Sequence, residues 1–453
     1  MSSLETTTQP TTAPGPTGAA LLSALVGFRR DPVKMFGQAI RTYGPVLRIK
    51  VGPYHLHHIV HPDHIYQVLH SKKYEMSSAF GPSQAILGQG LSTNTGDAWL
   101  RQRRMMQPAF HHRHIAAFAD TIVREAAVTV ESWREPARQG AVVNVSRSLL
   151  PLNLRILGRI LFSADFSDQS HLLLQSLKTA RQYIERSMRR LVPIPQSWPT
   201  PGNRRFFHDV EQINAFTYNL ITERRRDPAG KEDLLNMLLL AQDRTTGEGM
   251  TDKELHDELM SVLFAAREDP ENAISWTLYL LTQHPSETQQ LQDELKQVLN
   301  GRHPTFEDLH NLPYLDMVVH ESLRLYPPTW SLLRDVQEAD EIGGYEIPAD
   351  TIILLNIYEA HRMPEFWPEP EQFNPHRFLP EPVKARPRHA YLPFGFGPRQ
   401  CIGRDLALTI IRLALAMILQ SYDISLAPGY RMERDAQLSL GPRHGVSMIL
   451  KEL

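Results

Sequence analysis

Residues 391–410 read YLPFGFGPRQCIGRDLALTI and contain the only cysteine of the chain, Cys401. Three glycines around it, Gly395, Gly397 and Gly403, lack side chains, so the backbone can turn tightly and approach a flat ligand closely. An apolar helix is expected to begin near residue 403. Its free N–H groups and positive dipole end would lie beside the sulfur and favour thiolate over thiol. The stretch therefore predicts a reactive or ligating thiolate.

A thiolate in this setting is either a nucleophile or a metal ligand. Arg399, two residues before Cys401, adds a positive charge that favours either use. A nucleophile needs a base close by, and no histidine pairs with the cysteine in the local sequence. One cysteine excludes an internal disulfide, a multi-cysteine zinc site and an iron–sulfur cluster. A lone soft ligand in a glycine-lined loop fits the axial position of a haem iron better.

The composition excludes several classes of protein. The chain has 453 residues and a formal net charge of −2, so it has no broad basic field for binding nucleic acid. It contains no run of about 18 apolar residues, the length that a membrane span needs. The apolar residues 19–28 are too short for a span and lack the positive region that begins a signal peptide. We expect a cytoplasmic protein without a membrane span.

The pattern along the chain predicts a mainly α-helical fold with small β-sheets (α+β). Residues 1–17 are rich in threonine and proline and predict a flexible N-terminal tail. Residues 18–453 contain no repeat or linker and predict one domain. The expected elements are a hairpin over 44–60, mainly helices over 97–330, strands over 343–358, a helix over 403–420 that is apolar nearly all round, and a strand pair around Leu440.

Residues 394–403, FGFGPRQCIG, resemble the haem-thiolate loop of the cytochrome P-450 family. Three further motifs of that family stand in the right order: GDAWLRQRR at 96–104, ESLR at 321–324 and FNPHRF at 373–378. The resemblance covers about residues 18–453 and is closest to the soluble bacterial type. It implies a single domain, a triangular prism of helices around a buried haem b (iron protoporphyrin IX).

The resemblance also implies how the haem is held. Cys401 would be the iron ligand and thus the metal site. Trp99 and Arg103 are four residues apart, on one face of a helix, and would bind the haem propionates. Arg334 and Arg399 are carried over in the same way. The remaining positions expected to contact the haem are Phe394, Gly395, Gly403 and Ala265.

Glu321 and Arg324 would form a structural network with Arg377. A Glu–Arg pair three residues apart on a helix is commonly a surface pair worth a few tenths of a kcal/mol. Here the resemblance implies that Arg377 completes a buried group of three, which must be fully paired to be tolerated. Its expected role is to hold the irregular segment that places Cys401.

Residues 260–284 predict one long helix over the haem, and its centre departs from the family pattern Ala-Gly-x-(Asp/Glu)-Thr-(Thr/Ser). Glu268 matches the acid, whereas Asp269 and Pro270 replace the two hydroxyl residues. Pro270 removes the helical partner of the Ala266 carbonyl, which can open a groove. Glu268 and Asp269 are the expected proton-delivering residues. An ordinary aspartate only accepts hydrogen bonds at neutral pH, unless an apolar site keeps it protonated as a donor.

Three functions stay open at this point. The first is dioxygen-dependent monooxygenation, by hydroxylation or epoxidation, with electrons from a separate ferredoxin or flavodoxin and its reductase. The second is peroxide-driven or non-dioxygen chemistry, such as nitrene transfer, cyclisation or rearrangement of a pre-oxidised substrate. The Arg-Pro pair of the family's peroxygenases is not matched, because Arg267 and Pro270 are separated. The third is a non-catalytic haem-binding sensor or carrier.

Family position also implies a mostly apolar substrate pocket in a monomeric protein. A hydrophobic secondary metabolite is expected, of the terpenoid, fatty acyl or aromatic class. Four arginines, Arg101, Arg104, Arg113 and Arg404, are either a docking patch for an acidic electron carrier or scattered solvated residues. The predicted substrate-binding residues are Phe80, Ile86, Leu87, Phe264, Arg267, Trp330, Leu333 and Leu440.

Overall fold

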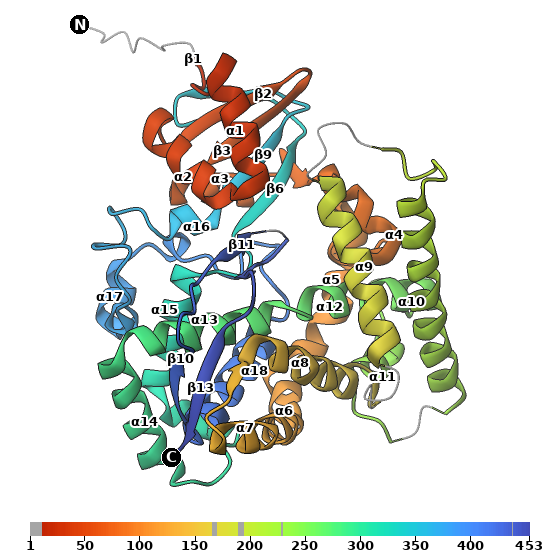
Figure 1. The fold of residues 1–453 in the computed structure, drawn as a ribbon. Coiled ribbons are helices and arrows are strands. Elements are labelled where there is room, and N and C mark those ends of the chain that lie inside the picture. The colour runs from red at the N-terminus through yellow and green to blue at the C-terminus, as the bar shows by residue number, and fades with distance from the viewer. Residues whose placement is uncertain (1–10, 165–169, 189–193, 228–229, 437) are drawn as a thin grey trace, which may run out of the picture. The chain divides into compact units, whose positions relative to one another are not determined.

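The computed structural model, drawn in Figure 1, describes residues 11–164, 170–188, 194–227, 230–436 and 438–453. It confirms a mainly α-helical fold with small sheets. The chain divides into two compact units, each assembled from three segments. Unit 1 comprises Met1–Ser78, Thr329–Glu371 and Lys384–Gln400; unit 2 comprises Ala79–Pro328, Gln372–Val383 and Cys401–Leu453. That residues 18–453 act as a single domain stays a prediction.

Unit 1 is built on a five-stranded sheet in the order β2-β3-β9-β6-β4. The predicted hairpin is confirmed as β2 and β3, and it turns at Gly52, whose φ of 58° favours glycine. Alternate side chains of β9, such as Ile353 and Leu355, join one apolar core with Val46 and Ile59. The strands are β1 (Thr11–Thr12), β2 (Val46–Val51), β3 (Tyr54–Ile59), β4 (Tyr74–Met76), β6 (Ser331–Val336), β7 (Asp340–Ile342), β8 (Tyr345–Ile347) and β9 (Ile352–Asn356). The helices are α1 (Gly18–Arg30), α2 (Pro32–Tyr43), α3 (Pro62–His70), α16 (Ile357–Ala360) and the 3-10 helix η5 (Arg388–Ala390).

The end of the predicted flexible tail is ordered, and for these residues the prediction is wrong. β1 pairs in parallel with β8, and Ala13 is buried. The N–H of Arg48 donates to the Pro14 carbonyl at 2.7 Å. Pairing with the edge of a sheet satisfies backbone groups that a composition argument leaves to solvent. Residues 1–10 lie outside the described part of the chain.

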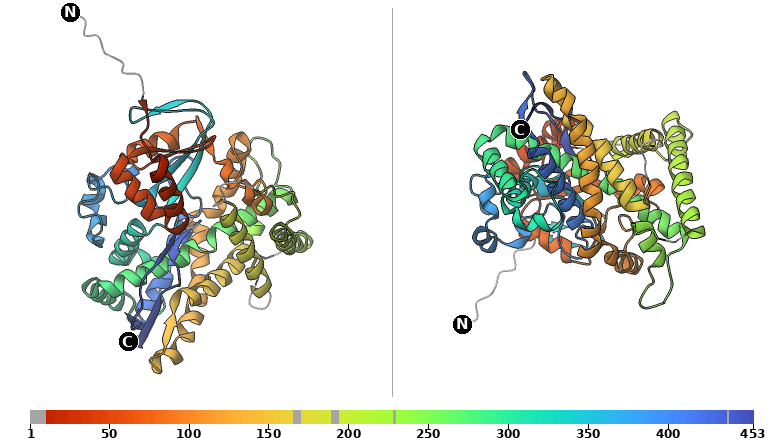
Figure 2. Two further views of the ribbon diagram at one scale, coloured as in Figure 1. Left: turned by 45° about the horizontal axis from the view of Figure 1, so that its top comes forward. Right: turned by 90° about the horizontal axis from the view of Figure 1, so that it is seen from below.

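Unit 2 holds most of the helices and two small sheets, ordered β10-β13-β5 and β11-β12. α9 and α10 lie side by side, and α6 packs against α8 and α18 (Figures 1 and 2). The main helices are α4 (Gln84–Leu87), α5 (Gly96–Met106), α6 (His112–Ser132), α7 (Arg134–Arg138), α8 (Val145–Phe162), α9 (Ser170–Met188), α10 (Pro201–Arg226), α11 (Leu234–Leu240), α12 (Asp252–Ala266), α13 (Asp269–Gln283), α14 (Pro285–Leu299), α15 (Pro313–Leu325) and α18 (Arg404–Leu419). The strands are β5 (Val142–Asn144), β10 (Tyr422–Leu426), β11 (Arg434–Ala436), β12 (Leu440–Pro442) and β13 (Ser447–Glu452). Short 3-10 helices are η2 (Gln107–Phe110), η3 (Glu307–Asn311) and η4 (Pro375–Phe378); η1 (Ser78–Ser83) and α17 (Pro380–Ala385) cross unit boundaries.

Helix α18 is the predicted apolar helix that follows Cys401. Most of its side chains are buried, which explains why its sequence has no polar face. Arg412 in its middle donates to Asp316 of α15 at 2.9 Å, so its charge is paired. None of the described helices combines the length and the hydrophobicity that crossing a membrane requires.

Candidate active site

Cys401 opens the last segment of unit 2, just before α18. Burial is the largest influence on its thiol and raises the pKa, and the charge of Asp269 raises it further. A hydrogen bond from the N–H of Gly403 and the charges of Arg103 and Arg404 lower it. The side chain nevertheless has accessible surface. The thiol is thus surrounded by protein and yet remains accessible.

Helix α5 places two predicted haem contacts on one face, since Trp99 and Arg103 are one turn apart and both half-buried. Burial lowers the pKa of Arg103, and the charge of Cys401 raises it, so the guanidinium lies near the sulfur. The neighbouring Gln102 is buried and donates to the Gln89 carbonyl at 2.7 Å. This bond fixes the helix to the loop that precedes it.

In unit 1, the loop before Cys401 turns at two glycines with positive φ, Gly395 at 70° and Gly397 at 74°. A Cβ on Gly397 would lie 3.1 Å from the Leu69 carbonyl oxygen and 3.2 Å from the His70 ring. A Cβ on Gly395 would have room, with Leu332 at 3.9 Å, so there the backbone angle alone requires glycine. The loop is thus held in the tight turn that the sequence predicted.

Arg334 on β6, also in unit 1, is a buried cation with neutral contacts. It donates to the Leu333 carbonyl at 2.8 Å and lies 3.9 Å from the sulfur of Met76. Among the described residues no carboxylate pairs with it. Burial lowers its pKa to about 10, and the charge of Arg399 acts in the same direction. A buried guanidinium of this kind fits a carboxylate supplied by a ligand.

The predicted three-member ion network is confirmed in unit 2. Arg324 donates to both carboxylate oxygens of Glu321 at 2.7 Å, and the side chains of both are fully buried. Glu321 also accepts from the N–H of Asn374 at 2.9 Å and lies 3.4 Å from Arg377. Arg324 donates in addition to the Gln372 carbonyl at 3.0 Å. The network ties α15 to the segment around η4, as expected for a fully paired buried group.

The predicted long central helix is broken, and the prediction of one continuous helix is wrong at residues 267–268. α12 ends at Ala266, and α13 begins at Asp269 with Pro270 in its first turn. The amide of Asn153, buried on α8, donates to the carbonyls of Ala266 at 2.7 Å and Arg267 at 2.6 Å. One side chain therefore satisfies the carbonyl that Pro270 orphans and the carbonyl after it. Nothing in the sequence around Asn153 marks this role.

The acid Glu268 and its neighbour Arg267 join an ion cluster with α9. Arg267 and Arg181 both pair with Glu268, and Arg181 donates to Glu185 at 2.6 Å. Burial lowers the pKa of Arg267 to about 10. Burial raises the pKa of Glu271 to about 8, against the charges of Arg267 and Arg181. Arg267, predicted to bind substrate, thus has its guanidinium buried in this cluster.

Asp269, the first residue of α13, binds a residue that the sequence did not suggest. Its Oδ1 accepts a hydrogen bond from the Ser439 hydroxyl at 2.7 Å. Ser439 in turn accepts from the Asn272 amide at 2.9 Å. One turn before Asp269, Ala265 is exposed although most residues of α12 around it are not. The charge of Asp269 is felt at Cys401, so this end of α13 lies near the sulfur.

Each unit holds residues of a kind that binds a haem through a thiolate. In unit 2, Cys401 offers a thiol that burial keeps neutral until a cation replaces its proton, and the charge of Arg103 acts on it. In unit 1, the loop before Cys401 turns at two glycines, and Arg334 is a buried cation suited to a carboxylate. A thiol ligand, close backbone and cations are what an iron-bearing macrocycle with acidic side groups requires.

The family model for cytochrome P-450 matches residues 13–445. The chain belongs to the cytochrome P-450 family. The cofactor of the family is a haem whose iron is bound by a thiolate, and Cys401 is the one cysteine available for it. The chain is accordingly an oxidoreductase of the monooxygenase type.

Named relatives and a solved structure agree with this assignment. The chain is 34% identical over 425 residues to cyclooctat-9-en-7-ol 5-monooxygenase of Streptomyces melanosporofaciens, covering 92% of this chain and 91% of that protein. It is 30% identical to pentalenene oxygenase of Streptomyces avermitilis, covering 87% of each. The crystal structure of the cytochrome P450DA haem domain matches with a TM-score of 0.90 at 26% identity, covering 98% of this chain and 97% of that one.

The predicted substrate contacts of the P-450 occupy different environments. Phe264 is half-buried and packs with Ile86 and Leu87 in the core of unit 2. Leu440 is fully buried, so it presents no surface to a ligand in this structure. In unit 1, Leu333 is half-buried, and Trp330 is buried near Phe36. The side chain of Phe80 lies outside the described residues. Substrate contact by this set stays a prediction.

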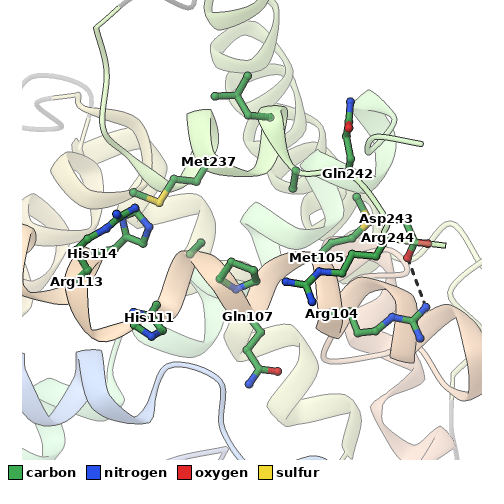
Figure 3. A pocket seen from close by; sticks show the side chains of 14 residues that line it. Arg104, Met105, Gln107, His111, Arg113, His114, Met237, Gln242, Asp243 and Arg244 are labelled. Carbon is green, nitrogen blue, oxygen red and sulfur yellow. Dashed lines mark hydrogen bonds and ion pairs between the residues drawn. The ribbon is translucent and has the colours of Figure 1, made fainter. Parts of the chain in front are cut away.

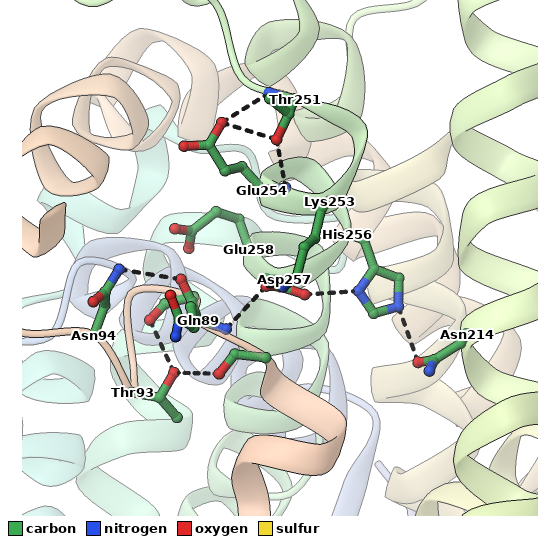
Figure 4. A network of polar contacts seen from close by, with 12 residues as sticks. Gln89, Thr93, Asn94, Asn214, Thr251, Lys253, Glu254, His256, Asp257 and Glu258 are labelled. Carbon is green, nitrogen blue, oxygen red and sulfur yellow. Dashed lines mark hydrogen bonds and ion pairs between the residues drawn. The ribbon is translucent and has the colours of Figure 1, made fainter.

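The loop that follows α4 is anchored to α12 by two adjacent acids. Asp257 accepts from the N–H of Gln89 and Glu258 from that of Leu91, both at 2.9 Å. Figure 4 shows Asp257 between Gln89 and His256. A Cβ on Gly90 would lie 2.5 Å from the Asp257 carbonyl oxygen, so only glycine allows this approach. No motif around these acids marks them as the anchors of the predicted substrate loop.

A cavity of about 850 Å³ lies between η2, the start of α6 and the segment after α11. Figure 3 shows Arg113 and His114 near Met237, and Arg104 paired with Asp243 at 3.4 Å. Arg244 lines the same cavity. Two predicted patch arginines, Arg104 and Arg113, are thus brought together. The other two are paired within the chain, Arg101 with Glu254 at 2.6 Å and Arg404 with Asp405 at 2.8 Å.

Proposed function

We propose that this P-450 holds haem b and hydroxylates or epoxidises a hydrophobic secondary metabolite, with terpenoids as the first class to test. The observation that carries the proposal is Cys401, which accepts a hydrogen bond from the N–H of Gly403 and remains accessible. The relatives named as monooxygenase and oxygenase support the same reaction type. Fatty acyl and aromatic metabolites complete the substrate panel. We propose further that the protein is a cytoplasmic monomer.

When bound, the haem supplies the iron at which dioxygen is activated. Cys401 ligates that iron, and Arg103 with Trp99 binds one propionate. Arg334, which is buried with neutral contacts, binds the other with help from Arg399. Arg334 then gains the anionic partner that a buried guanidinium needs. The positions that lie against the ring are Phe394, Gly395, Gly403 and Ala265.

Glu268 and Asp269 have different roles in proton delivery. Glu268 is half-buried and paired with Arg181, so it reaches both the interior and the surface and takes up protons. Asp269 accepts from Ser439 through one oxygen and orients water in the site. The substrate is held by apolar walls that exclude bulk water. The proposed wall residues are Phe80, Ile86, Leu87, Phe264, Trp330, Leu333 and Leu440, with Arg267 contributing through the cluster beside them.

One observation favours a second candidate function. Oδ1 of Asp269 accepts a hydrogen bond at the position where the family has a donating hydroxyl. A site without that donor suits peroxide-driven turnover or rearrangement of a pre-oxidised substrate, because neither requires protons to be delivered to dioxygen. Nitrene transfer and cyclisation belong to the same class.

Electrons come from a ferredoxin or flavodoxin with its reductase. An acidic carrier suits the cavity of Figure 3, whose rim holds Arg104, Arg113 and Arg244 against the single, buried Asp243. Arg113→Glu is expected to raise the KM for an acidic ferredoxin at low salt. Arg404→Glu, at a residue already paired with Asp405, is the matched control with a smaller effect. Equal effects of the two variants would contradict docking at the cavity.

Two measurements test the reaction. The ferrous protein with carbon monoxide is expected to show the red-shifted band of thiolate ligation, and Cys401→His to lose it; a wild type without the band contradicts both candidates. Turnover is then compared with dioxygen plus an electron-donor system and with hydrogen peroxide alone. Product in the first arm supports monooxygenation. Product only with peroxide, together with oxygen-dependent turnover gained by Asp269→Thr, overturns it in favour of the second candidate.

A further inference from the structure

We propose that Ser439 is a positioning residue that fixes the Asp269 carboxylate in one orientation, as a hydrogen-bond acceptor beside the haem-thiolate site. This role rests on the proposed haem-binding function, whereas the contacts that support it lie within unit 2. Ser439 belongs to the segment just before β12, 170 residues after Asp269 in the sequence. A hydroxyl from a distant part of the chain thus contacts position 269, where the family's helix carries a hydroxyl of its own.

The direction of the hydrogen bonds determines the role of each group. The Asn272 amide nitrogen can only donate, so Ser439 is the acceptor in the 2.9 Å contact between them. The one proton of the Ser439 hydroxyl is then given to Oδ1 of Asp269, 2.7 Å away. Asp269 and Asn272 are three residues apart and lie on one face of α13. Ser439 bridges them and leaves each little rotational freedom.

The segment that carries Ser439 is itself rigidly held. The Leu440 carbonyl accepts from the Trp276 indole at 3.0 Å, and the Leu440 N–H donates to the Pro328 carbonyl at 2.7 Å. A Cβ on Gly441 would lie 2.4 Å from the oxygen of the Asn272 amide, so β12 packs against α13 as closely as glycine allows. That contact also orients the Asn272 amide, with its oxygen toward Gly441 and its nitrogen toward Ser439.

The start of a helix adds a second reason for a charged Asp269. The free N–H groups of the first turn of α13 favour a negative side chain there. A hydroxyl that donates to a carboxylate stabilises the charged form further. Helix α13, which begins at Asp269, packs against α18, which begins just after Cys401. A fixed carboxylate near Cys401 therefore disfavours anions at the iron and accepts hydrogen bonds from water or substrate.

The test measures azide and imidazole binding to the ferric holoprotein by absorption, without turnover. Asp269→Asn removes the charge and is expected to tighten azide binding about tenfold, with imidazole changed less than twofold. Ser439→Ala removes a donor that stabilises the charged carboxylate, so it should tighten azide binding in the same direction as Asp269→Asn, but by less. In the Asp269→Asn background the same serine substitution should have no effect, which a double-mutant cycle detects. Ser439→Thr keeps a hydroxyl and should restore wild-type binding.

Ser275→Ala is the matched control, because Ser275 is also a buried serine with a hydrogen-bonded hydroxyl and is part of α13. It pairs with Ser146 of α8 at 2.8 Å and follows Asp269 by six residues. It should cost similar thermal stability and leave both affinities unchanged. Equal azide affinities for Ser439→Ala and Ser275→Ala, or an undiminished serine effect without the Asp269 charge, would overturn the proposal. Failure of dioxygen turnover would leave this result intact, so the two proposals fail separately.

Discussion

Replacing Glu258 by glutamine should change how the stability of the protein depends on pH. Glu258 lies on α12 and has no accessible surface. One carboxylate oxygen accepts from the Leu91 N–H at 2.9 Å, and the other has no partner among the described residues. Burial raises the pKa of Glu258 from 4.5 to about 8, against the Leu91 hydrogen bond, and the charges of Asp257 and Glu254 act with burial.

The sign and size of the effect follow from proton linkage. In the unfolded chain Glu258 loses its proton near pH 4.5, whereas in the folded protein it keeps the proton to about pH 8. Its contribution to stability is therefore full below pH 4.5 and is lost as pH rises through the folded pKa. At about 1.4 kcal/mol per pH unit, the wild type loses about 3 kcal/mol between pH 5 and pH 7 relative to Glu258→Gln. Burying an amide N–H₂ without a partner adds a cost of about 1–3 kcal/mol that does not vary with pH.

The assay is urea unfolding of the haem-bound protein at pH 5, 6, 7 and 8. The difference in free energy of unfolding, variant minus wild type, should rise steadily with pH. Asp257→Asn is the matched control at the adjacent residue. Burial tends to raise the pKa of Asp257, but hydrogen bonds from His256, Lys253 and the Gln89 N–H outweigh it and lower the pKa. Its difference should change much less with pH, because Asp257 affects this titration only through its smaller charge effect on Glu258. A pH dependence for Glu258→Gln no larger than that of Asp257→Asn would refute the reasoning.

Three further substitutions have expected results. Asn153→Ala leaves two buried carbonyls at the helix break without a donor and should lower the free energy of unfolding by about 2–4 kcal/mol in urea. Arg324→Ala removes the bidentate partner of the buried Glu321 and should lower the free energy of unfolding by about 3–5 kcal/mol. The double variant Arg324→Ala, Glu321→Ala should lose less than the sum of the two single variants. Burial lowers the pKa of His58 to about 3, so the stability it contributes above pH 6.5 is lost as pH falls. Urea unfolding from pH 6.5 to 4.5 should show the wild type losing about 2 kcal/mol relative to His58→Gln.

The parts of the site that could be predicted are those whose signal is local. Gly395, Gly397 and Cys401 lie within seven residues, and the positive backbone angles at the first two positions favour glycine. The pair Glu321 and Arg324 is also local. Its third member, Arg377, was placed by resemblance, and the structure confirms it.

The parts that could not be predicted join ordinary residues across long stretches of sequence. Asn153 reaches the helix break from 113 residues away, and Ser439 reaches Asp269 from 170. An asparagine in an amphipathic helix or a serine before a strand fits many roles, and no periodicity records a distant partner. The same reason explains the ordered end of the tail, since its partner β8 follows some 330 residues later.

The break in the central helix is stabilised by contacts from three other segments of the chain. Asn153 holds two carbonyls, Arg181 pairs with Glu268, and Ser439 holds Asp269. Pro270 is then not the sole cause of the break. Pro270→Ala would restore an N–H, but its helical acceptor, the carbonyl four residues earlier, already receives the Asn153 amide. Straightening the helix should therefore require removal of Asn153 as well, and the Asp269 carboxylate should keep its place in the single Pro270 variant.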